Sequence, residues 1–470
     1  MNALAGRIAA ASAGRHVLAV SDGKAGLTGV ELAEAAADAA RRVVAVSRRD
    51  SPVVAVSLPL SVDLVTHLVA AVTGGFSVCL LDPSASEGHR AAVVAALAPD
   101  VVVDADGVRA WTPTTGSPSP VPDDPAAAGY IAMSSGSTGG GPKAVLSSWE
   151  SVGQFVADGA RALELDASSV WAEASHLAYD MAITNALVAL ACGATLQLSP
   201  SLGDRLRPLR FADRVGATHL RVAPRFVDLA VAEQRRAPER LQVWACGGDR
   251  LQVGQVEALL DLGVPAVVNT YGTSETIGFA SAARFTGSAP VPGHRGVATI
   301  GAGVVGSWSV ELASPAPPGQ GDGPVPELLA IRSAHLPGGL LFGSSAGEYP
   351  AWRDGHVLTG DLGVQVDGSF FCLGRSGRRV KRHGLFVNLD DVDAQVRDHT
   401  GMPSFTVLTA EGRLVTLVES TDGVDAIRGS LSSVLSPDLL PDLVVAVRQV
   451  PRLANGKVDL AAAAALAEAG

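Results

Sequence analysis

The sequence has few cysteines and few charged residues, and it contains no long uninterrupted apolar run. Its four cysteines are scattered singly through apolar segments without C-x-x-C spacing, so neither a zinc site nor a disulfide framework is expected. Charges, glycines or prolines interrupt every apolar run well before the roughly eighteen residues of a membrane helix. Arg7 and Arg15 also interrupt the start of the chain, where a signal peptide would need an apolar core. We therefore expect a cytoplasmic protein without a membrane partner.

The balance of charge argues against polyanionic partners. Charged residues make up 18% of the chain, apolar residues make up 47%, and the formal net charge is −11. A negative net charge disfavours nonspecific binding to nucleic acid and to anionic membranes, so a small soluble substrate is the better expectation. Because 470 residues exceed the size at which single hydrophobic cores stop growing, we expect two domains of unequal size.

Alternating strand and helix patterns predict an α/β fold with parallel sheets. Strand patterns at 52–59, 76–83 and 101–104 alternate with helix patterns at 62–72 and 89–97. This βαβ order is typical of a parallel sheet. Further strands are predicted at 170–174, 195–198, 219–223, 243–246 and 266–270. A ligand is expected at the carboxyl ends of such strands.

Composition also predicts where the chain divides. Two stretches rich in proline, glycine and serine, at 112–125 and 314–326, are expected to be exposed loops. From about residue 377 onward, a short series of strand and helix patterns ends in an alanine-rich helix at 460–469. The predicted domains are an N-terminal one at 1–376 and a smaller C-terminal one at 377–470.

The stretch from Ser134 to Lys143 has the composition expected of a polyphosphate site. Its glycines allow the backbone to approach phosphate oxygens closely, and Lys143 adds a positive charge. Ser137 and Thr138 add hydroxyl donors. The stretch is not the P-loop of NTPases, because Pro142 precedes the lysine and no hydroxyl residue follows it. A flexible glycine- and serine-rich loop is the alternative.

Two other glycine-containing segments match known patterns without the required context. Residues 301–306 satisfy the dinucleotide-binding fingerprint, but 307–312 alternate like a strand, so we predict a turn between strands. Residues 343–347 satisfy the nucleophile-elbow pattern of hydrolases, although no strand-to-helix turn is predicted there. A hydrolase with Ser345 as the nucleophile is a rival interpretation. Its partners would be Asp361 and His383.

Three later segments make the glycine-rich stretch much more specific. They are Asn269 to Thr276, Thr359 to Leu362 followed by Gly374-Arg375, and Pro451 to Lys457. Together with Ser134 to Lys143, and in this order, they resemble the motifs of the adenylate-forming superfamily. That superfamily includes acyl-CoA synthetases and the adenylation domains of nonribosomal peptide synthetases. The resemblance covers essentially the whole chain.

The resemblance implies a fold and a reaction. The fold would be a large N-terminal domain with parallel sheets and helices, which carries ATP and substrate, and a small mobile α+β C-terminal domain. In the reaction, a carboxylate oxygen would attack the α-phosphorus of ATP to give an acyl adenylate and pyrophosphate. The sequence is most similar to a stand-alone amino-acid adenylation enzyme of the nonribosomal peptide synthetase type, as found in natural product biosynthesis.

The resemblance also implies which residues bind the nucleotide. Tyr271 would stack on adenine, and Asp361 would accept hydrogen bonds from both ribose hydroxyls. Taken singly, a core tyrosine and a turn aspartate are the alternatives. The full implied ATP site is Ser134, Ser135, Gly136, Ser137, Thr138, Gly139, Lys143, Gly247, Gly248, Asp249, Asn269, Tyr271, Gly272, Ser274, Asp361 and Arg375.

Three residues are implied to act in catalysis. Lys457 would bridge the incoming carboxylate and the nucleotide, because a lysine carries a compact charge on a long, flexible side chain. A solvated surface lysine is the alternative. Glu275 and Thr138 would hold Mg²⁺. A single carboxylate is sufficient, because magnesium keeps several waters and binds phosphate oxygens as well.

Asp180 indicates the type of substrate. Tyr179-Asp180 resembles the Phe-Asp segment of amino-acid-activating domains, in which the aspartate binds the substrate's ammonium group. A helix N-cap is the alternative. The implied substrate site is Asp180, Met181, Thr184, Arg221, Trp244, Cys246, Thr270, Gly278 and Phe279. In such a pocket Arg221 would face an acidic or strongly polar substrate group, unless it pairs structurally elsewhere.

The last implied features are a hinge and an acyl acceptor. Gly377 occupies the hinge position of the family, where glycine tolerates a large dihedral change; an ordinary loop glycine is the alternative. Because the chain ends soon after Lys457, we expect a separate acceptor. The phosphopantetheine thiol of a carrier protein and free coenzyme A are the candidates, and Asp180 favours the carrier. An ATP-binding regulator without turnover is a further alternative, since the phosphate stretch is one residue longer than the family pattern.

Overall fold

The computed structural model divides into two compact units, which are described separately below. Unit 1 comprises residues 1–311, 330–359 and 367–371, and unit 2 comprises 312–329, 360–366 and 372–470. Unit 2 thus contains the predicted C-terminal tail and two earlier segments, and the boundary at residue 377 stays a prediction. The structure describes residues 2–85, 87–111, 119–135, 142–175, 180–233, 236–313, 326–336, 340–342, 351–353, 355–382, 385–409, 412–421, 424–432, 435, 440–453 and 458–469.

Unit 1 contains a mixed eight-stranded sheet with the order β14-β13-β12-β11-β9-β10-β1-β2. Its bounds are β1 (Leu18–Ser21), β2 (Gly26–Thr28), β9 (Val170–Glu173), β10 (Thr195–Leu198), β11 (His219–Val222), β12 (Val243–Cys246), β13 (Ala266–Tyr271) and β14 (Ser281–Phe285). The inner strands run parallel, whereas β2 and β14 pair antiparallel at the edges. The strands predicted between residues 170 and 270 are confirmed, with ends that shift by no more than one residue.

A second sheet of unit 1 has seven strands in the order β20-β8-β7-β4-β3-β5-β6. Its bounds are β3 (Val53–Val56), β4 (Ser77–Leu80), β5 (Val101–Asp104), β6 (Gly107–Ala110), β7 (Gly129–Ser135), β8 (Pro142–Ser148) and β20 (Leu340–Phe342). Strand β3 pairs parallel with both β4 and β5, which confirms the βαβ prediction for the first part of the chain. Strands β7 and β8 pair antiparallel, a feature that the periodicity did not predict.

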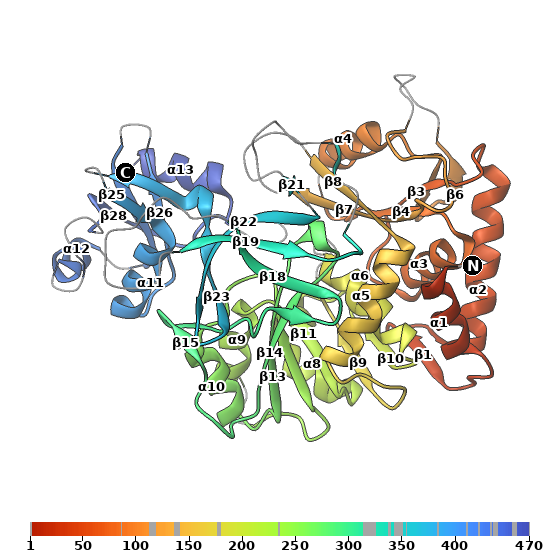
Figure 1. Cartoon of the computed structure of the whole chain (residues 1–470), viewed down its shortest axis with the longest axis horizontal. Coiled ribbons are helices and arrows are strands. Elements are labelled where there is room, and N and C mark those ends of the chain that lie inside the picture. The colour runs from red at the N-terminus through yellow and green to blue at the C-terminus, as the bar shows by residue number, and fades with distance from the viewer. Residues whose placement is uncertain are drawn as a thin grey trace. The chain divides into compact units, whose positions relative to one another are not determined.

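The helices of unit 1 are α1 (Ala3–Ser12), α2 (Gly29–Val46), α3 (Val62–Gly74), α4 (Glu87–Leu97), α5 (Trp149–Ala162), α6 (Asp180–Ala191), α7 (Leu202–Leu206), α8 (Pro208–Val215), α9 (Arg225–Glu233) and α10 (Val253–Asp261). Helices α1, α2 and α3 pack together at one side of the unit (Figure 1). The capping box of Thr28 and Glu31 explains why α2 begins where it does. Among the described helices, none has the length and apolar character needed to cross a bilayer.

The remaining strands of unit 1 form one two-stranded sheet, or belong wholly or in part to a six-stranded sheet. They include β15 (Gly293–His294) with β16 (Val297–Ala298), β17 (Val304–Val305) with β18 (Trp308–Ala313), and β21 (Ala351–Arg353) with β22 (His356–Val366). The β17–β18 pair contains the end of the dinucleotide-like glycine motif. No helix follows its last glycine, because β18 begins instead, which confirms the predicted turn between strands. Strands β18, β19 (Glu327–Arg332), β22 and β23 (Ser369–Arg375) contain residues of both units.

Unit 2 has its own sheet and core. Strands β26 (Ser404–Leu408), β27 (Leu414–Glu419) and β28 (Leu443–Val447) form a sheet, and β24 (Arg379–Arg382) pairs with β25 (Leu385–Asn388). Its helices are α11 (Leu389–Thr400), α12 (Asp425–Leu431) and α13 (Leu460–Ala469). Helix α13 has the predicted bounds, and its Ala463 and Ala467 pack against the sheet. The α/β fold with a smaller C-terminal α+β unit is therefore confirmed.

Candidate active site

The predicted phosphate stretch spans the end of a hairpin. In the β7–β8 ladder Ser134 lies opposite Lys143, and Ser135 lies opposite Pro142. The two strands therefore bring both ends of the stretch together. Its central residues, which include Gly136, Ser137, Thr138 and Gly139, lie outside the described residues, as do the side chains of Ser134, Ser135 and Lys143.

Two predicted nucleotide-site glycines stand where a side chain would not fit. Gly247 follows β12, and a Cβ built on it would lie 2.5 Å from Thr270 Oγ1 and 2.8 Å from Arg221 Nη2. Gly272 follows β13, and a Cβ there would collide with the carbonyl oxygen of Gly278. Because β12 and β13 are adjacent and parallel, both glycines lie at the carboxyl edge of the same sheet. At this edge the backbone can approach a ligand closely.

The side chains of β13 hold this edge in place. Asn269 donates a hydrogen bond to the carbonyl oxygen of Thr299 over 3.0 Å, and the buried Tyr271 hydroxyl donates to Thr359 Oγ1 over 3.1 Å. The neighbouring loop residue Asp249 is exposed. Tyr271 thus has a fixed orientation beside Gly247 and Gly272, the glycines that follow β12 and β13.

Glu275 lies in the short 3-10 helix Ser274–Thr276 that follows β13. Its side chain is buried, and Ser274 is partly buried. The next residue after this turn, Ile277, has φ +74°, a backbone conformation that a β-branched residue rarely adopts. Such strain commonly accompanies functional sites. One buried carboxylate at this position fits a magnesium ion that also binds phosphate oxygens and water.

Arg221 belongs to a buried polar cluster that we call the arginine relay, formed by Arg221, Asn185 and Glu173. Arg221 Nη1 donates to Asn185 Oδ1 over 3.4 Å, and Asn185 Nδ2 donates to Glu173 Oε2 over 2.7 Å. Arg221 Nε also donates to Thr270 Oγ1 over 3.2 Å, and its guanidinium lies 4.8 Å from the Phe279 ring centroid. The sequence-predicted residues Arg221, Thr270 and Phe279 are therefore brought together.

Burial dominates the electrostatics of this relay. It lowers the pKa of Arg221 to about 10, and the charge of Glu173 opposes that shift. Burial also raises the pKa of the Glu173 carboxyl. Glu173 accepts further hydrogen bonds from Trp171 Nε1 and from the backbone N–H of Ser175. Since every one of these partners donates to Glu173, they favour its ionised form, and the Arg221 cation then has an internal counter-charge.

Trp244 and Cys246 face away from the arginine relay. They lie in register with Leu220 and Val222, and all four pack in one hydrophobic cluster. Because side chains alternate along a strand, Arg221 projects from the opposite face of the sheet. Burial raises the pKa of the Cys246 thiol to about 12, so this thiol is not reactive at neutral pH. The structure therefore does not bring Trp244 and Cys246 together with Arg221.

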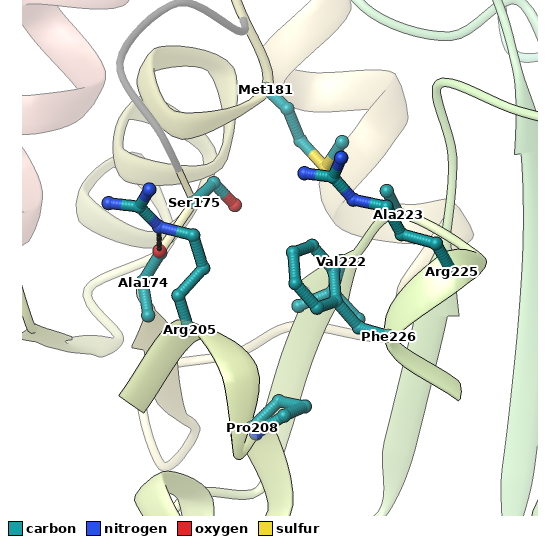
Figure 2. Close-up of a pocket in the computed structure, with 9 residues that line it drawn as sticks. All are labelled: Ala174, Ser175, Met181, Arg205, Pro208, Val222, Ala223, Arg225 and Phe226. Carbon is teal, nitrogen blue, oxygen red and sulfur yellow. Dashed lines mark hydrogen bonds between the residues drawn. The ribbon is translucent and has the colours of Figure 1, made fainter. Parts of the chain in front are cut away.

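Met181 and Thr184 stand on the first turns of α6. Thr184 Oγ1 donates to the carbonyl oxygen of Met181 over 3.1 Å, so its hydroxyl is used within the helix. Met181 contributes to a pocket at the carboxyl ends of β9 and β11 (Figure 2). A Cβ built on Gly248 would lie 3.6 Å from Met181 Cε, which connects this pocket to the predicted nucleotide edge. Gly278 packs directly on the Phe155 ring.

Unit 2 contains the predicted ribose site and hinge. Arg375 Nε lies 2.8 Å from Asp361 Oδ1, so the two residues predicted at one end of the nucleotide form an ion pair. Gly377 lies in the short 3-10 turn Ser376–Arg378 that joins β23 to β24. Arg378 follows it and forms ion pairs with Asp390 and Asp393, which anchors the chain directly after this glycine.

Several predicted residues fall outside the described part of the chain. They are Lys457, the central residues of the phosphate stretch, Tyr179, the side chain of Asp180, and the Ser345 and His383 of the rival hydrolase. Conversely, Asn185 and Glu173 were not predicted. The only local signal for Glu173 is an acidic residue at the end of the otherwise apolar segment Val170 to Ala174.

Comparison with known proteins identifies what the chain resembles. The model of the AMP-binding enzyme family matches residues 7–312. Malpinin synthetase of Mortierella alpina is 26% identical over 473 residues, which cover 89% of this chain and 6% of that protein. The isonitrile lipopeptide synthase of Streptomyces coeruleorubidus is 28% identical over 515 residues, which cover 97% of this chain and 33% of that protein. The chain thus spans only a small part of these relatives.

A solved structure shows the same fold. The o-succinylbenzoate coenzyme A synthetase of Bacillus subtilis, in complex with ATP and magnesium ion, superposes with a TM-score of 0.79 at 17% identity. The match covers 97% of this chain and 98% of that one. The similarity therefore extends over the α/β fold of nearly the whole chain.

Proposed function

Because the chain belongs to the AMP-binding enzyme family, as its resemblance to the adenylate-forming superfamily predicted, we propose that it activates an amino acid with ATP and Mg²⁺. The carboxylate oxygen of the acid attacks the α-phosphorus of ATP. The bond from this phosphorus to the bridging oxygen breaks, and pyrophosphate leaves with its electron pair. The products are an acyl adenylate and pyrophosphate.

In the second step, the phosphopantetheine thiol of a separate carrier protein takes up the acyl group. Its sulfur attacks the acyl carbon, the bond from this carbon to the AMP oxygen breaks, and AMP leaves as the thiol gives up its proton. The products are a thioester and AMP. One of the relatives named above is a lipopeptide synthase by name, which supports a carrier over free coenzyme A. The superposed coenzyme A synthetase is similar in fold alone.

The observation that carries the proposal is the carboxyl edge of β12 and β13. Gly247 and Gly272 stand there at positions where a Cβ would collide, beside the oriented Tyr271 and the buried Glu275. The glycines allow close approach of the backbone, Tyr271 offers an aromatic face, and Glu275 offers a magnesium ligand. A site for a nucleoside triphosphate requires these three elements. When bound, Mg²⁺ would neutralise phosphate charge, and Glu275 with Thr138 would hold it.

Lys457 is proposed to stabilise the negative charge that develops as the two anions meet. The test is pyrophosphate exchange over a panel of amino acids and fatty acids. We expect Lys457→Ala to lose exchange by about 100-fold or more while keeping a native circular dichroism spectrum. Lys24→Ala, at an exposed position between β1 and β2, is the control and should retain normal exchange.

Four results would contradict the proposal. Near-normal exchange by Lys457→Ala would remove the assigned role of this lysine, and clear preference for fatty acids would defeat the amino-acid assignment. Tight ATP binding without pyrophosphate release would favour a nucleotide-binding regulator instead. Equal acyl transfer to free coenzyme A and to the carrier would argue against the carrier as the dedicated acceptor.

A further inference from the structure

The hydrogen bonds of the arginine relay continue beyond Arg221 to the backbone at the end of β12. Arg221 Nε donates to Thr270 Oγ1 over 3.2 Å, and Thr270 Oγ1 donates in turn to the carbonyl oxygen of Cys246 over 2.6 Å. Thr270 lies on β13, which pairs parallel with β12. A hydroxyl group has a single hydrogen to donate. The hydrogen of Thr270 is therefore used for the carbonyl of Cys246.

The peptide group between Cys246 and Gly247 is bound at both of its polar ends. Its carbonyl oxygen accepts from Thr270, and its N–H donates to the carbonyl oxygen of Val222 on β11 over 3.3 Å. Because a peptide group is planar, two such bonds fix its orientation. Gly248 follows with φ +82°, a conformation that glycine adopts without strain. The fixed peptide group therefore sets the direction in which the chain leaves β12 at the predicted nucleotide edge.

Burial strengthens the hydrogen bond that Thr270 makes. The members of the series, each 5% exposed or less, are Glu173, Asn185, Arg221, Thr270 and Cys246. Hydrogen bonds that involve a charged group are stronger than neutral ones, and a hydroxyl that accepts such a bond is polarised and becomes a better donor. The Arg221 cation therefore strengthens the bond from Thr270 to the backbone, and Glu173 provides the counter-charge that keeps this cation buried.

These contacts change the role expected of Thr270. The sequence placed this residue among those that line the substrate pocket. In the structure its hydroxyl cannot donate to a substrate unless it releases the carbonyl of Cys246. A Cβ built on Gly247 would lie 2.5 Å from Thr270 Oγ1, so the hydroxyl also packs directly against this glycine. Thr270 therefore acts on the backbone of the nucleotide edge.

We propose that Thr270 is a positioning residue for the nucleotide, and that the arginine relay orients its hydroxyl. Thr270 fixes the peptide group between Cys246 and Gly247, so that the backbone of Gly247 and Gly248 is presented to the nucleotide in one orientation. The inference rests on the proposed function for the identity of this ligand. Loss of the hydroxyl weakens nucleotide binding and leaves the selection among amino acids unchanged.

The first experiment separates the effects on the two substrates. Pyrophosphate exchange gives kcat, the KM for ATP and the KM for the amino acid in wild type, Thr270→Val and Thr270→Ser. Valine keeps the branched shape of threonine without the hydroxyl, whereas serine keeps the hydroxyl. We expect Thr270→Val to raise the KM for ATP about 10-fold, as for one lost hydrogen bond to a buried carbonyl. The KM for the amino acid should stay within about twofold of wild type, and Thr270→Ser should restore the KM for ATP.

The matched control for this experiment is Thr66→Val in helix α3. The Thr66 hydroxyl is also buried in unit 1 and also donates to a backbone carbonyl, that of Val62, over 2.9 Å. Its loss should leave both KM values unchanged. If Thr270→Val raises the KM for the amino acid and not the KM for ATP, Thr270 lines the substrate pocket and the proposal is wrong.

The second experiment tests whether the relay acts through Thr270. Equilibrium binding of AMP is measured for wild type, Glu173→Gln, Thr270→Val and the double variant, each checked for a native circular dichroism spectrum. We expect Glu173→Gln to weaken AMP binding less than Thr270→Val does. The double variant should bind AMP about as weakly as Thr270→Val alone, because both changes act through the same hydrogen bond. Fully additive losses would overturn the assignment of the relay.

The third experiment needs neither nucleotide nor turnover. Hydrogen–deuterium exchange, followed by mass spectrometry over residues 243–250, reports how firmly the Gly247 N–H is held. We expect exchange at this amide to be about 10-fold faster in Thr270→Val than in wild type or Thr66→Val. If no acid supports pyrophosphate exchange in wild type, the proposed function fails, while this difference can still stand. If Thr270→Val matches Thr66→Val in AMP binding and in amide exchange, Thr270 is not a positioning residue.

Discussion

Replacement of Arg221 by methionine distinguishes a structural cation from a substrate-facing one. In the structure, Arg221 compensates the fully buried Glu173 through Asn185, donates to Thr270, and stacks on Phe279. Methionine keeps much of the volume but removes the charge, which leaves Glu173 as an uncompensated buried carboxylate. Removal of one partner from a buried ion pair costs about 3 to 5 kcal/mol. We therefore expect the free energy of unfolding of unit 1 to fall by about this amount.

The double variant isolates the electrostatic part of that loss. Glu173→Gln removes the buried negative charge while Trp171 and Asn185 keep a side-chain amide as a neighbour. We expect Arg221→Met combined with Glu173→Gln to be more stable than the sum of the single effects predicts, with a coupling of about 1 to 3 kcal/mol. Arg284→Gln, which breaks a partly exposed ion pair, serves as control and should cost less than about 1 kcal/mol.

Tryptophan fluorescence during urea unfolding is the suitable assay. All six tryptophans belong to unit 1, so the signal follows this unit and not unit 2. A free energy of unfolding for Arg221→Met within about 1 kcal/mol of the wild-type value would refute a structural role for this arginine. The same role is refuted if adding Glu173→Gln to Arg221→Met recovers none of the free energy of unfolding that Arg221→Met loses. A stable Arg221→Met variant with altered amino-acid preference would instead restore the substrate-facing interpretation.

Two further predictions concern unit 1. Gly247→Ala should lower the free energy of unfolding by about 1 to 3 kcal/mol and reduce pyrophosphate exchange, because its Cβ would lie 2.5 Å from Thr270 Oγ1. The control is Gly254→Ala on α10, where an added Cβ would have no other atom within 4 Å. This control should be neutral or stabilising in the same assays. Burial lowers the pKa of His219 to about 4 from 6.5, so the folded state resists protonation. A fall in pH from about 6.5 to about 4 should therefore destabilise unit 1 by roughly 3 kcal/mol through this residue. Urea titrations across this range should show a flatter pH dependence for His219→Gln, and an unchanged slope would contradict the assignment.

Local patterns predicted much of the fold. The period of the apolar residues located strands β3, β5 and β9 to β13, and the alanine-rich segment located α13, because each depends on neighbours in the sequence. The antiparallel β7–β8 pair was not predicted, since pairing partners are chosen by packing over long distances along the chain. The separation of the longer strands of unit 1 into different sheets has the same cause.

The sequence by itself determined the family, through the order and composition of motifs whose chemistry is local: glycines near phosphate, an aromatic residue after a strand, and an acidic residue in the turn that follows. Only the tertiary structure decided which side chains face one another. A strand alternates its side chains, but the sequence does not say which helices cover each face. On one side of the sheet, Arg221 therefore hydrogen-bonds Asn185, which in turn hydrogen-bonds Glu173. On the other side, Trp244 and Cys246 pack in the core. The pocket that Met181 helps to line likewise exists only because the ends of β9 and β11 meet the starts of α6 and α9.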